Sequence, residues 1–319
     1  MRQSINRNII RGTILLSLLL ITMCWAHGYA QHLTIRNDAT MRLHGSAVMR
    51  IAGDLTAQGS YVSNQASKTV IGGSNDAYIT GSIRPGAVSK FGSGTLYVKH
   101  GFSTDGFITL NDGNIVTLTT PLTLGTTSRL IGESQSQYVI GRAAANRTVG
   151  TGSSDFGGLG CSITSGATDI GDTRLTRLSG PGTAVSDATY AGINRQWWLY
   201  PDTDPTGGRT LTFSWELDDD NGKDLTKLQI WKSTDYGVSW SQVGATQDAS
   251  ATRVVTLTGE TTLGRYTVSD INNPLTNASS FATNLICDPT PQLITSTTPS
   301  AKQTVAVKYL VGAGGKAYG

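Results

Sequence analysis

The sequence contains few of the residues on which most catalytic and metal sites depend. Its 319 residues include 3 cysteines and 4 histidines, and only 15% of them are charged. His32, His44 and His100 lie far apart and have no neighbouring Cys or carboxylate cluster, so their spacing does not predict a metal site. The sequence has no G-x-S-x-G nucleophile elbow and no phosphate-binding glycine loop. These absences argue against the motif-bearing hydrolases, nucleotide-binding enzymes and zinc enzymes.

Long apolar runs are also missing. The run Ile14–Ile21 is too short for a stop-transfer helix, and no later stretch approaches the ~20 apolar residues that a membrane helix needs. Three arginines (Arg2, Arg7 and Arg11) precede the run, and small residues occur at Gly28 and Ala30. This pattern predicts a signal peptide over residues 1–30 that is cleaved near Ala30. We therefore expect a secreted or cell-surface protein without a transmembrane segment in its mature form.

The mature chain is expected to be electrically neutral. Three of the 25 basic residues and none of the 22 acidic residues lie in the first thirty positions, which leaves 22 of each sign. A neutral chain without a Lys/Arg cluster lacks the electrostatic pattern of a protein that binds nucleic acid or anionic membranes. Cys161 and Cys287 remain after cleavage, in an oxidising compartment. They form either a disulfide or two buried free thiols.

Glycine-punctuated short strands predict an all-β fold. Over residues 31–150, apolar and polar residues alternate in segments such as Leu33–Ile35, Tyr78–Thr80 and Leu122–Leu124, with turn residues between them. Strands this short favour a β-solenoid or β-helix, in which each coil pairs with the next. An edge-to-edge sandwich is the alternative. A glycine-rich boundary is expected at residues 151–160.

Residues 161–271 are predicted to form a small, Ig-like β-sandwich. Five of the six tryptophans lie between Trp197 and Trp240. The alternation over Leu211–Leu217 indicates a strand with one buried face, and Asn221-Gly222 fits the turn that follows it. Residues 272–319 are rich in Pro, Ser and Thr, and we expect them to be a linker and tail that continue in a longer protein.

The segment Ser233–Trp240 fits the Asp-box pattern S-x-D-x-G-x-x-W. A turn of this kind needs a carboxylate that accepts amide hydrogen bonds, a glycine with positive φ and a tryptophan that packs beneath it. We predict a structural role for its key residues, which are Ser233, Asp235, Gly237 and Trp240. A sialidase-like activity is not expected, because the chain has one copy of the motif and no arginine set that would grip a carboxylate.

The acidic run near residue 220 raises the hypothesis of a calcium site, because hard cations take several oxygens from one turn. Its carboxylates belong to Asp218, Asp219, Asp220 and Asp224. When Asn221-Gly222 is placed at the fifth and sixth positions of an EF-hand loop, Leu217 and Leu228 fall at its ends, where neither can ligate. A solvated hairpin tip is therefore the favoured interpretation. Calcium is the only cofactor considered, and none is required.

Two carbohydrate-related alternatives remain open. Adjacent strand residues point to opposite sides, so at most one of Trp197 and Trp198 should face the core. An outer patch of Trp198, Tyr200 and Trp231 would then stack on sugars. A β-helix lyase or hydrolase would instead need paired acids on the solenoid. The candidates there are Asp54, Asp76, Asp105, Asp112 and Glu133, with Arg84, Lys90 and Lys99, and they are scattered over turn positions.

Three stretches carry a family resemblance: Gly53–Gly59 with Thr69–Gly73 and Tyr78–Gly81; Leu110–Leu118 with Leu122–Gly125 and Tyr138–Gly141; and Asn194–Trp198 with Trp231 and Ser233–Trp240. In pattern and order they resemble cell-surface proteins of Bacteroidota-type bacteria that are exported through the type IX secretion system. The resemblance covers most of residues 50–271 and implies stalks and adhesins. Residues 272–319 depart from it, because they contain no recognisable sorting domain.

We therefore predict a non-catalytic secreted surface protein that acts as an adhesive, structural or docking module. Its expected partners are surface glycans or other surface proteins, and nucleic acid is not among them. The alternative function is a carbohydrate-active protein, either a sugar-binding module or a β-helix polysaccharide lyase or hydrolase.

Overall fold

A computed structural model of the protein describes residues 31–118, 120–187, 189–276 and 278. These residues belong to one compact unit, Met1–Ile286, and the second unit, Cys287–Gly319, lies outside the described residues. The described chain is nearly all β, with one short 3₁₀ helix, η1 (Leu217–Asp219). Within the described residues, no helix is both long enough and apolar enough to cross a membrane. The predicted all-β class is confirmed.

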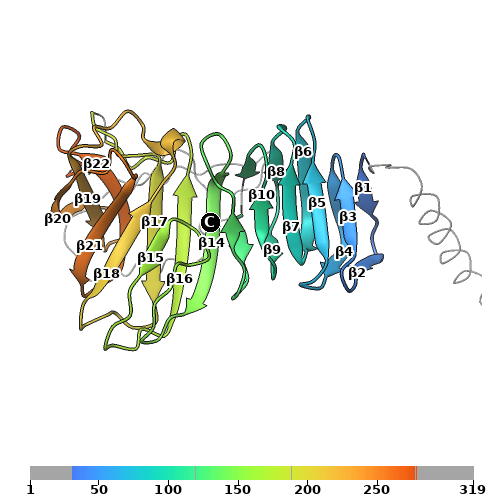
Figure 1. The fold of residues 1–319 in the computed structure, drawn as a ribbon, viewed down its shortest axis with the longest axis horizontal. Helices are drawn as coiled ribbons and strands as arrows, with labels where there is room; N and C mark the ends of the chain where they lie inside the picture. Colours follow the sequence, from blue (N-terminus) through green and yellow to red (C-terminus); the bar gives the residue numbers. More distant parts are fainter. Residues whose placement is uncertain (1–30, 119, 188, 277, 279–319) are drawn as a thin grey trace, which may run out of the picture. The chain divides into compact units, whose positions relative to one another are not determined.

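The first half of the described chain is a β-solenoid of about six turns (Figure 1). Its strands pair in parallel, and paired residues in successive coils are about twenty positions apart. For example, Leu55 pairs with Ile79, 24 residues on, and Ala77 pairs with Leu96, 19 residues on. The predicted solenoid is therefore confirmed. Its strands are β1 (Leu33–Ile35), β2 (Thr40–Leu43), β3 (Val48–Ile51), β4 (Leu55–Ser63), β5 (Lys68–Gly72), β6 (Ala77–Arg84), β7 (Ala87–Phe91), β8 (Leu96–Val98), β9 (Phe102–Thr104), β10 (Ile108–Leu110), β11 (Ile115–Thr117), β12 (Leu122–Leu124), β13 (Leu130–Ile131) and β14 (Val139–Thr148).

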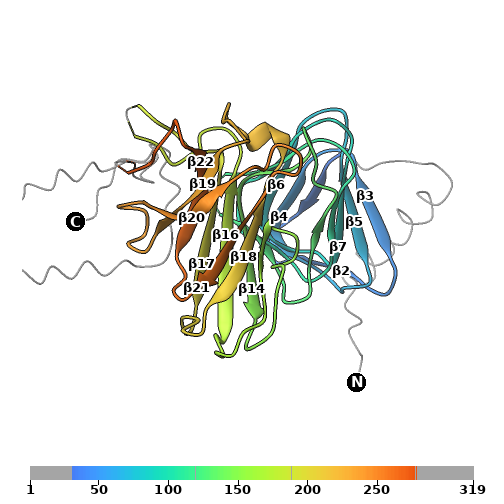
Figure 2. The same ribbon diagram turned by 60° about the vertical axis from the view of Figure 1, so that its left-hand side comes forward.

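Two walls of strands enclose the solenoid core (Figure 2). One wall is the five-stranded sheet of β3, β5, β7, β10 and β13, and the other belongs to a 14-stranded sheet that contains β1, β4, β6, β8, β11 and β14. Alternate residues point inward, so equivalent positions stack in columns such as Ala77, Leu96, Ile115 and Val139, each no more than 1% exposed. The alternation seen in the sequence is therefore the inward and outward alternation of the coils.

Close approach of neighbouring coils explains a glycine at the bend of β6. Gly81 has a φ of +96°, and a Cβ built on it would lie only 1.9 Å from the carbonyl oxygen of Ala57 in the neighbouring coil. A side chain cannot fit there without moving the backbone. The glycines that punctuate the sequence therefore mark both turns and contacts between coils.

The 14-stranded sheet continues from the solenoid into the second half of the chain. β14 pairs in parallel with β11 and β12 on one edge, and in antiparallel fashion with β16 on the other over eight residue pairs, Gly141–Thr148 with Asp172–Ser179. The sheet thus runs past residues 151–160, where a boundary was expected. The domain limits at 31–150, 151–160 and 161–271 remain predictions. The added strands are β16 (Asp172–Ser179), β17 (Arg195–Pro201), β22 (Arg265–Asp270), β19 (Leu228–Ser233) and β20 (Ser241–Gln247).

A third sheet, of three strands, packs against this antiparallel region. It consists of β15 (Cys161–Ile163), β18 (Arg209–Ser214) and β21 (Val254–Glu260). Phe213 of β18 joins the two sheets, because its ring centroid lies 4.9 Å from that of Trp197 and 5.1 Å from that of Tyr266. The aromatic core expected for this region therefore exists. Its Ig-like character is not confirmed.

A buried ion pair links the end of the solenoid to the second half, and a second buried pair lies near it within the second half. The Arg177 guanidinium on β16 donates to both oxygens of Glu133, which follows β13, at 2.6 and 2.8 Å. Arg195 Nε on β17 donates to Asp219 Oδ2 in η1 at 2.6 Å. Burial alone would raise the pKa of Glu133, but the charge and hydrogen bonds of Arg177 outweigh it and lower that pKa. Both halves thus share one polar network.

Candidate functional site

The three aromatic residues predicted to bind sugars have different environments. Trp198 and Trp231 are 6% and 4% exposed, and Tyr200 at the end of β17 is half-buried. Trp197 belongs to the hydrophobic core and Trp198 does not, so at most one of the two faces the core, as alternation predicts. Trp198 is nevertheless covered on its own side of the strand and does not form the predicted outer patch. The two faces of the strand are both covered. Of the three predicted residues, only Tyr200 offers an accessible ring.

Arginine side chains cover Trp198. The guanidinium carbon of Arg265 lies 4.0 Å from the Trp198 ring centroid, and that of Arg142 lies 5.1 Å from it. The Trp198 Nε1 donates to Gln196 Oε1 at 3.1 Å. A guanidinium over an indole face is a favourable cation–π contact. Trp198 therefore supports the surrounding residues from below and does not itself present a ring to a ligand.

Trp231 belongs to a separate small apolar cluster. It packs with Trp240 and with residues from two segments that cover the outer face of the sheet, namely Val185, Leu275 and Ala278. Alternation correctly places Trp231 opposite the core-facing Ile230, but the covering segments bury it. Sequence periodicity does not report such coverage.

A cavity of about 240 Å³ lies beside Tyr200. Three segments meet there: the end of β17 with the loop after it, the turn after β19, and the start of β22. Aromatic rings, carboxylates and hydroxyls share its walls, a combination typical of sites that recognise a partly polar ligand. The lining residues are Tyr200, Pro201, Asp202, Asp204, Ser233, Thr234, Tyr236, Leu263, Gly264 and Arg265.

Tyr200 and Tyr236 form an aromatic shelf at this cavity. Their ring centroids are 5.9 Å apart with an interplanar angle of 29°, and Tyr236 is 53% exposed. Arg265 Nε donates to the Tyr200 hydroxyl at 2.8 Å, and its guanidinium carbon lies 5.7 Å from the Tyr236 ring centroid. Arg265 thus lies between Trp198 and the shelf and holds both tyrosines. No sequence pattern singles out Tyr236. Its only signal was an aromatic side chain at a variable position of a turn motif.

The turn that presents Tyr236 is held by Asp235. The carboxylate accepts hydrogen bonds from the Ser233 hydroxyl at 2.7 Å and from the amide and hydroxyl of Ser239 at 3.0 and 2.6 Å. Burial opposes ionisation of Asp235, but these bonds outweigh it and lower the pKa to about 2. Gly237 has a φ of +90° and Trp240 is 3% exposed. The turn therefore has the predicted contacts, whereas its assignment as an Asp-box remains a prediction.

Tyr236 has an unusual backbone. Its φ is +61°, in the left-handed region that favours glycine and that costs about 1–2 kcal/mol for other residues. Such conformations occur at ligand-binding sites more often than elsewhere, because surrounding contacts hold the residue in a useful orientation. Here the hydrogen bonds of Asp235 and the stack on Tyr200 hold it. An exposed aromatic ring is thereby fixed at the rim of the cavity.

The two acids of the cavity are anchored by backbone amides. Asp202 Oδ2 accepts from the Asp172 amide at 2.9 Å, and Asp204 Oδ1 accepts from the Leu263 amide at 2.7 Å. Anchoring one oxygen of each carboxylate fixes the side chain. Within the described residues, the other oxygen of each accepts no hydrogen bond. Two oriented acceptors therefore lie beside the aromatic shelf.

The acidic run proposed as a calcium site directs its carboxylates to separate protein groups. Asp218 accepts from the Ser136 amide at 2.6 Å, and Asp219 and Asp220 pair with Arg195 and Arg253 at 2.6 and 2.8 Å. Asp224 accepts from the hydroxyl and amide of Thr226 at 2.7 and 3.1 Å. Throughout the described residues, no group of three or more His, Cys, Asp or Glu side chains is arranged to hold a metal. The geometry gives the calcium hypothesis no support.

The charged residues considered for a β-helix enzyme mostly serve the coils. Asp54 and Asp76 accept from the amides of Tyr78 and Thr95, and Asp105 pairs with Arg84. Lys99 lies over the Tyr78 ring, with its Nζ 4.2 Å from the ring centroid, and Glu133 binds Arg177. Lys90 is buried in the core column of Ile71, and its Nζ donates to carbonyls that include that of Asp112 at 2.8 Å. These contacts explain the residues as parts of the fold. Of the histidines, His32 lies 3.4 Å from Asp54, and His44 and His100 are exposed.

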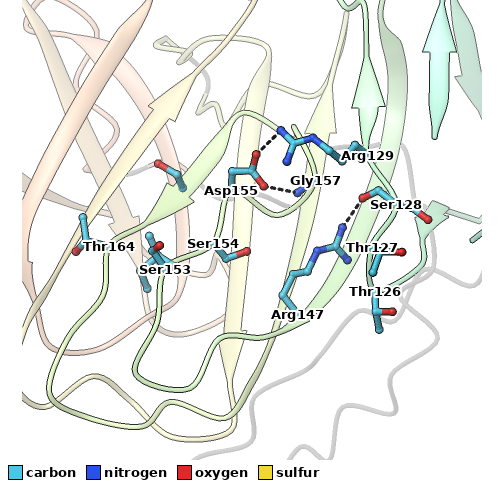
Figure 3. Close-up of a pocket in the computed structure, with 12 residues that line it drawn as sticks. Thr126, Thr127, Ser128, Arg129, Arg147, Ser153, Ser154, Asp155, Gly157 and Thr164 are labelled. Atoms are coloured by element: carbon cyan, nitrogen blue, oxygen red, sulfur yellow. Dashed lines mark hydrogen bonds and ion pairs between the residues drawn. The ribbon is translucent and has the colours of Figure 1, made fainter. Parts of the chain in front are cut away.

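A larger groove, of about 640 Å³, lies where the last complete coil meets the Gly150–Gly160 segment (Figure 3). Figure 3 shows Arg129 reaching Asp155 across the groove and Arg147 reaching the Ser128 carbonyl. Arg147 also donates to the Gly125 and Asn146 carbonyls at 2.8 and 2.9 Å. Both arginines that line the groove, Arg129 and Arg147, are thus bound to other groups of the protein. The residues that line it include no aromatic ring, so we favour the aromatic cavity as the binding site.

Cys161 is buried on β15, and burial raises the pKa of its thiol. Its predicted disulfide partner, Cys287, lies outside the described residues, so that pairing remains a prediction. The sites described above rest on geometry alone. No protein-family model, curated protein or solved structure matches this chain.

Proposed function

We propose that this protein is a non-catalytic binding module and that its aromatic cavity binds a carbohydrate. The observation that carries the proposal is the exposed Tyr200–Tyr236 shelf with two anchored carboxylates, Asp202 and Asp204, beside it. The apolar C–H face of a sugar ring packs on an aromatic ring, and its hydroxyls donate to carboxylates. Neighbouring groups of both kinds favour a sugar over a purely apolar or purely charged ligand.

The shelf is organised before any ligand arrives. Arg265 holds the Tyr200 hydroxyl and packs on the buried Trp198, and the hydrogen bonds of Asp235 fix the turn that carries Tyr236. A binding site that is already ordered loses less conformational entropy when it binds. This order supports a recognition role for the cavity, because the exposed Tyr236 ring is already held in the orientation in which it would meet a ligand.

We further propose that this binding serves adhesion at the cell surface. The predicted leader at residues 1–30 and the resemblance to type IX secretion cargo of Bacteroidota-type bacteria support export, and the Ser233–Trp240 turn is interpreted as an Asp-box that serves as a scaffold. The solenoid acts as a spacer, because its sheet continues into the strands that carry the cavity. Surface glycans are the proposed partners.

A glycan and polysaccharide array tests the proposal, with calorimetric titration of every hit. We expect binding that is lost in Tyr200→Ala and Tyr236→Ala and retained in Tyr97→Ala. Tyr97 is a matched control, because it stacks on Tyr78 on the solenoid at 5.1 Å, away from the cavity. Binding that depends on Tyr97 instead, or no binding at all, would contradict the site. Release of reducing sugars or unsaturated products from a hit would contradict the non-catalytic role.

A further inference from the structure

The first coil of the solenoid continues the inward columns of the second coil, and three of these columns are open at this end. In the open columns the second-coil residues are no more than 2% exposed, whereas their first-coil partners are only partly buried. Ile35 and Ile51, at the ends of β1 and β3, are buried. An apolar cross-section of the solenoid therefore faces outward at β1, β2 and β3. The registered pairs are Leu33 with Leu55, Met41 with Tyr61, and Met49 with Thr69.

The backbone is open at the same place. Among the strands that the structure describes, β1 and β2 pair only with β4, and β3 pairs only with β5. Each of the three therefore has one edge whose amides and carbonyls are available to another strand. Repeat proteins normally cover such an end with a polar capping element. Unpaired edges and exposed inward columns thus coincide on one coil.

The charged side chains of this coil indicate which kind of segment could cover it. Its exposed side chains include three arginines, Arg36, Arg42 and Arg50, against a single acid, Asp38. A second copy of the coil would bring three more arginines to the same edge. Residues 1–30 contain three arginines and no acid, and residues 279–319 contain three lysines and one aspartate, so neither segment complements it. Complementarity favours an acidic partner.

We propose that the first coil is a docking site for an extended, acidic segment of another protein, in which apolar residues alternate with Glu or Asp. The segment adds one strand to β2 in the 14-stranded sheet and, after a bend like that of residues 44–47, a second strand to β3 in the five-stranded sheet. Its apolar side chains cover Met41 and Met49, and its carboxylates face Arg42 and Arg50. Main-chain hydrogen bonds supply affinity, and the alternating side chains supply specificity.

The test uses two labelled synthetic peptides, one of alternating valine and glutamate and the other of alternating valine and lysine. We expect the purified protein to bind the glutamate peptide in fluorescence anisotropy, and to protect amides of β1, β2 and β3 from hydrogen exchange in the complex. The double variant Arg42→Glu/Arg50→Glu should bind it about tenfold or more weakly and should gain affinity for the lysine peptide. Lys227→Glu, an exposed change far from this coil, should leave binding unchanged.

Three results would overturn the proposal. The first is equal binding of both peptides, and the second is protection confined to strands other than β1–β3. The third is self-association in sedimentation experiments that the double variant abolishes, which would make a second copy the occupant. If the variant does not fold, the salt dependence of wild-type binding decides: affinity for the glutamate peptide that is insensitive to NaCl would contradict the ion pairs.

Discussion

Replacing Arg177 with methionine is expected to destabilise the protein strongly, because it leaves Glu133 buried without its cation. The Arg177 side chain is 0% exposed and that of Glu133 is 10% exposed, and they share two hydrogen bonds. Removing one member of a buried pair costs about 3–5 kcal/mol. For a domain of this size, that loss lowers Tm by roughly 6–20 °C. Glu133→Leu/Arg177→Met should recover much of the loss, because neither charge is then left alone.

The pH dependence provides a sharper test than the magnitude. In the wild type the pKa of Glu133 is lowered, so its contribution to stability is fully present above its ordinary value near 4.5 and is lost as the pH falls through the lowered value. Without Arg177, burial raises the pKa of Glu133. Its contribution is then present below its ordinary value and lost as the pH rises through the raised one. The stability gap between wild type and Arg177→Met should therefore widen from pH 5 to pH 8.

Urea unfolding across this pH range measures the effect, with Arg84→Met as the matched control. Arg84 also pairs with a carboxylate, Asp105 at 2.8 Å, but its side chain is 63% exposed. Such exposed pairs contribute about 0–1 kcal/mol. If Arg177→Met costs no more than Arg84→Met, or if its stability gap to the wild type stays constant with pH, the argument that this buried network joins the two halves is refuted.

Three further predictions test the cavity and the core. Tyr236→Gly should change the free energy of unfolding by less than about 1 kcal/mol, because relief of the positive φ offsets the lost ring contacts. The same variant should bind glycan about thirtyfold more weakly. Urea unfolding and calorimetric titration of one preparation can measure both effects. Asp235→Asn should weaken glycan binding at neutral pH, and the wild-type turn should keep its hydrogen bonds down to about pH 4 and lose them as the pH approaches 2, where Asp235 takes up its proton, as NMR of the Ser239 amide can show. Cys161 should react with a thiol reagent only after unfolding, as mass spectrometry of labelled peptides can determine.

The solenoid could be predicted because the sequence pattern of each short strand and turn lies within a few neighbouring residues. Alternation over three to five residues identifies the inward positions, and glycines mark the bends, as Gly81 shows. One strand of the second half escaped prediction for the opposite reason. In β16 the inward positions carry Arg177 as well as Leu175, so the segment does not read as an alternating strand. The partner that makes this arginine acceptable, Glu133, lies 44 residues away in the sequence.

The predicted site residues show the same limit. The acidic run looked like a cation site because its carboxylates are adjacent in sequence. Their partners Arg195 and Arg253 come from distant segments and turn the carboxylates in different directions. Trp198 looked exposed because alternation sets the side of a strand, but it does not report that Arg142 and Arg265 cover that side. Tyr200 was found, and its partner Tyr236 required the three-dimensional arrangement.

The two proposed interaction surfaces are well separated, and the 14-stranded sheet connects β1 and β2 of one to β17 of the other. From β1 to β17 the strand order takes seven steps, so about 34 Å separates the open coil from the strand that carries Tyr200. This distance is several times the Debye length of about 8 Å at physiological salt, so charges at one surface do not influence ligands at the other. Any coupling between them must pass through the continuous sheet and the Glu133–Arg177 pair. A protein that binds a glycan at one surface and an acidic strand at the other would therefore hold both independently, which is what a surface adhesin that links two partners requires.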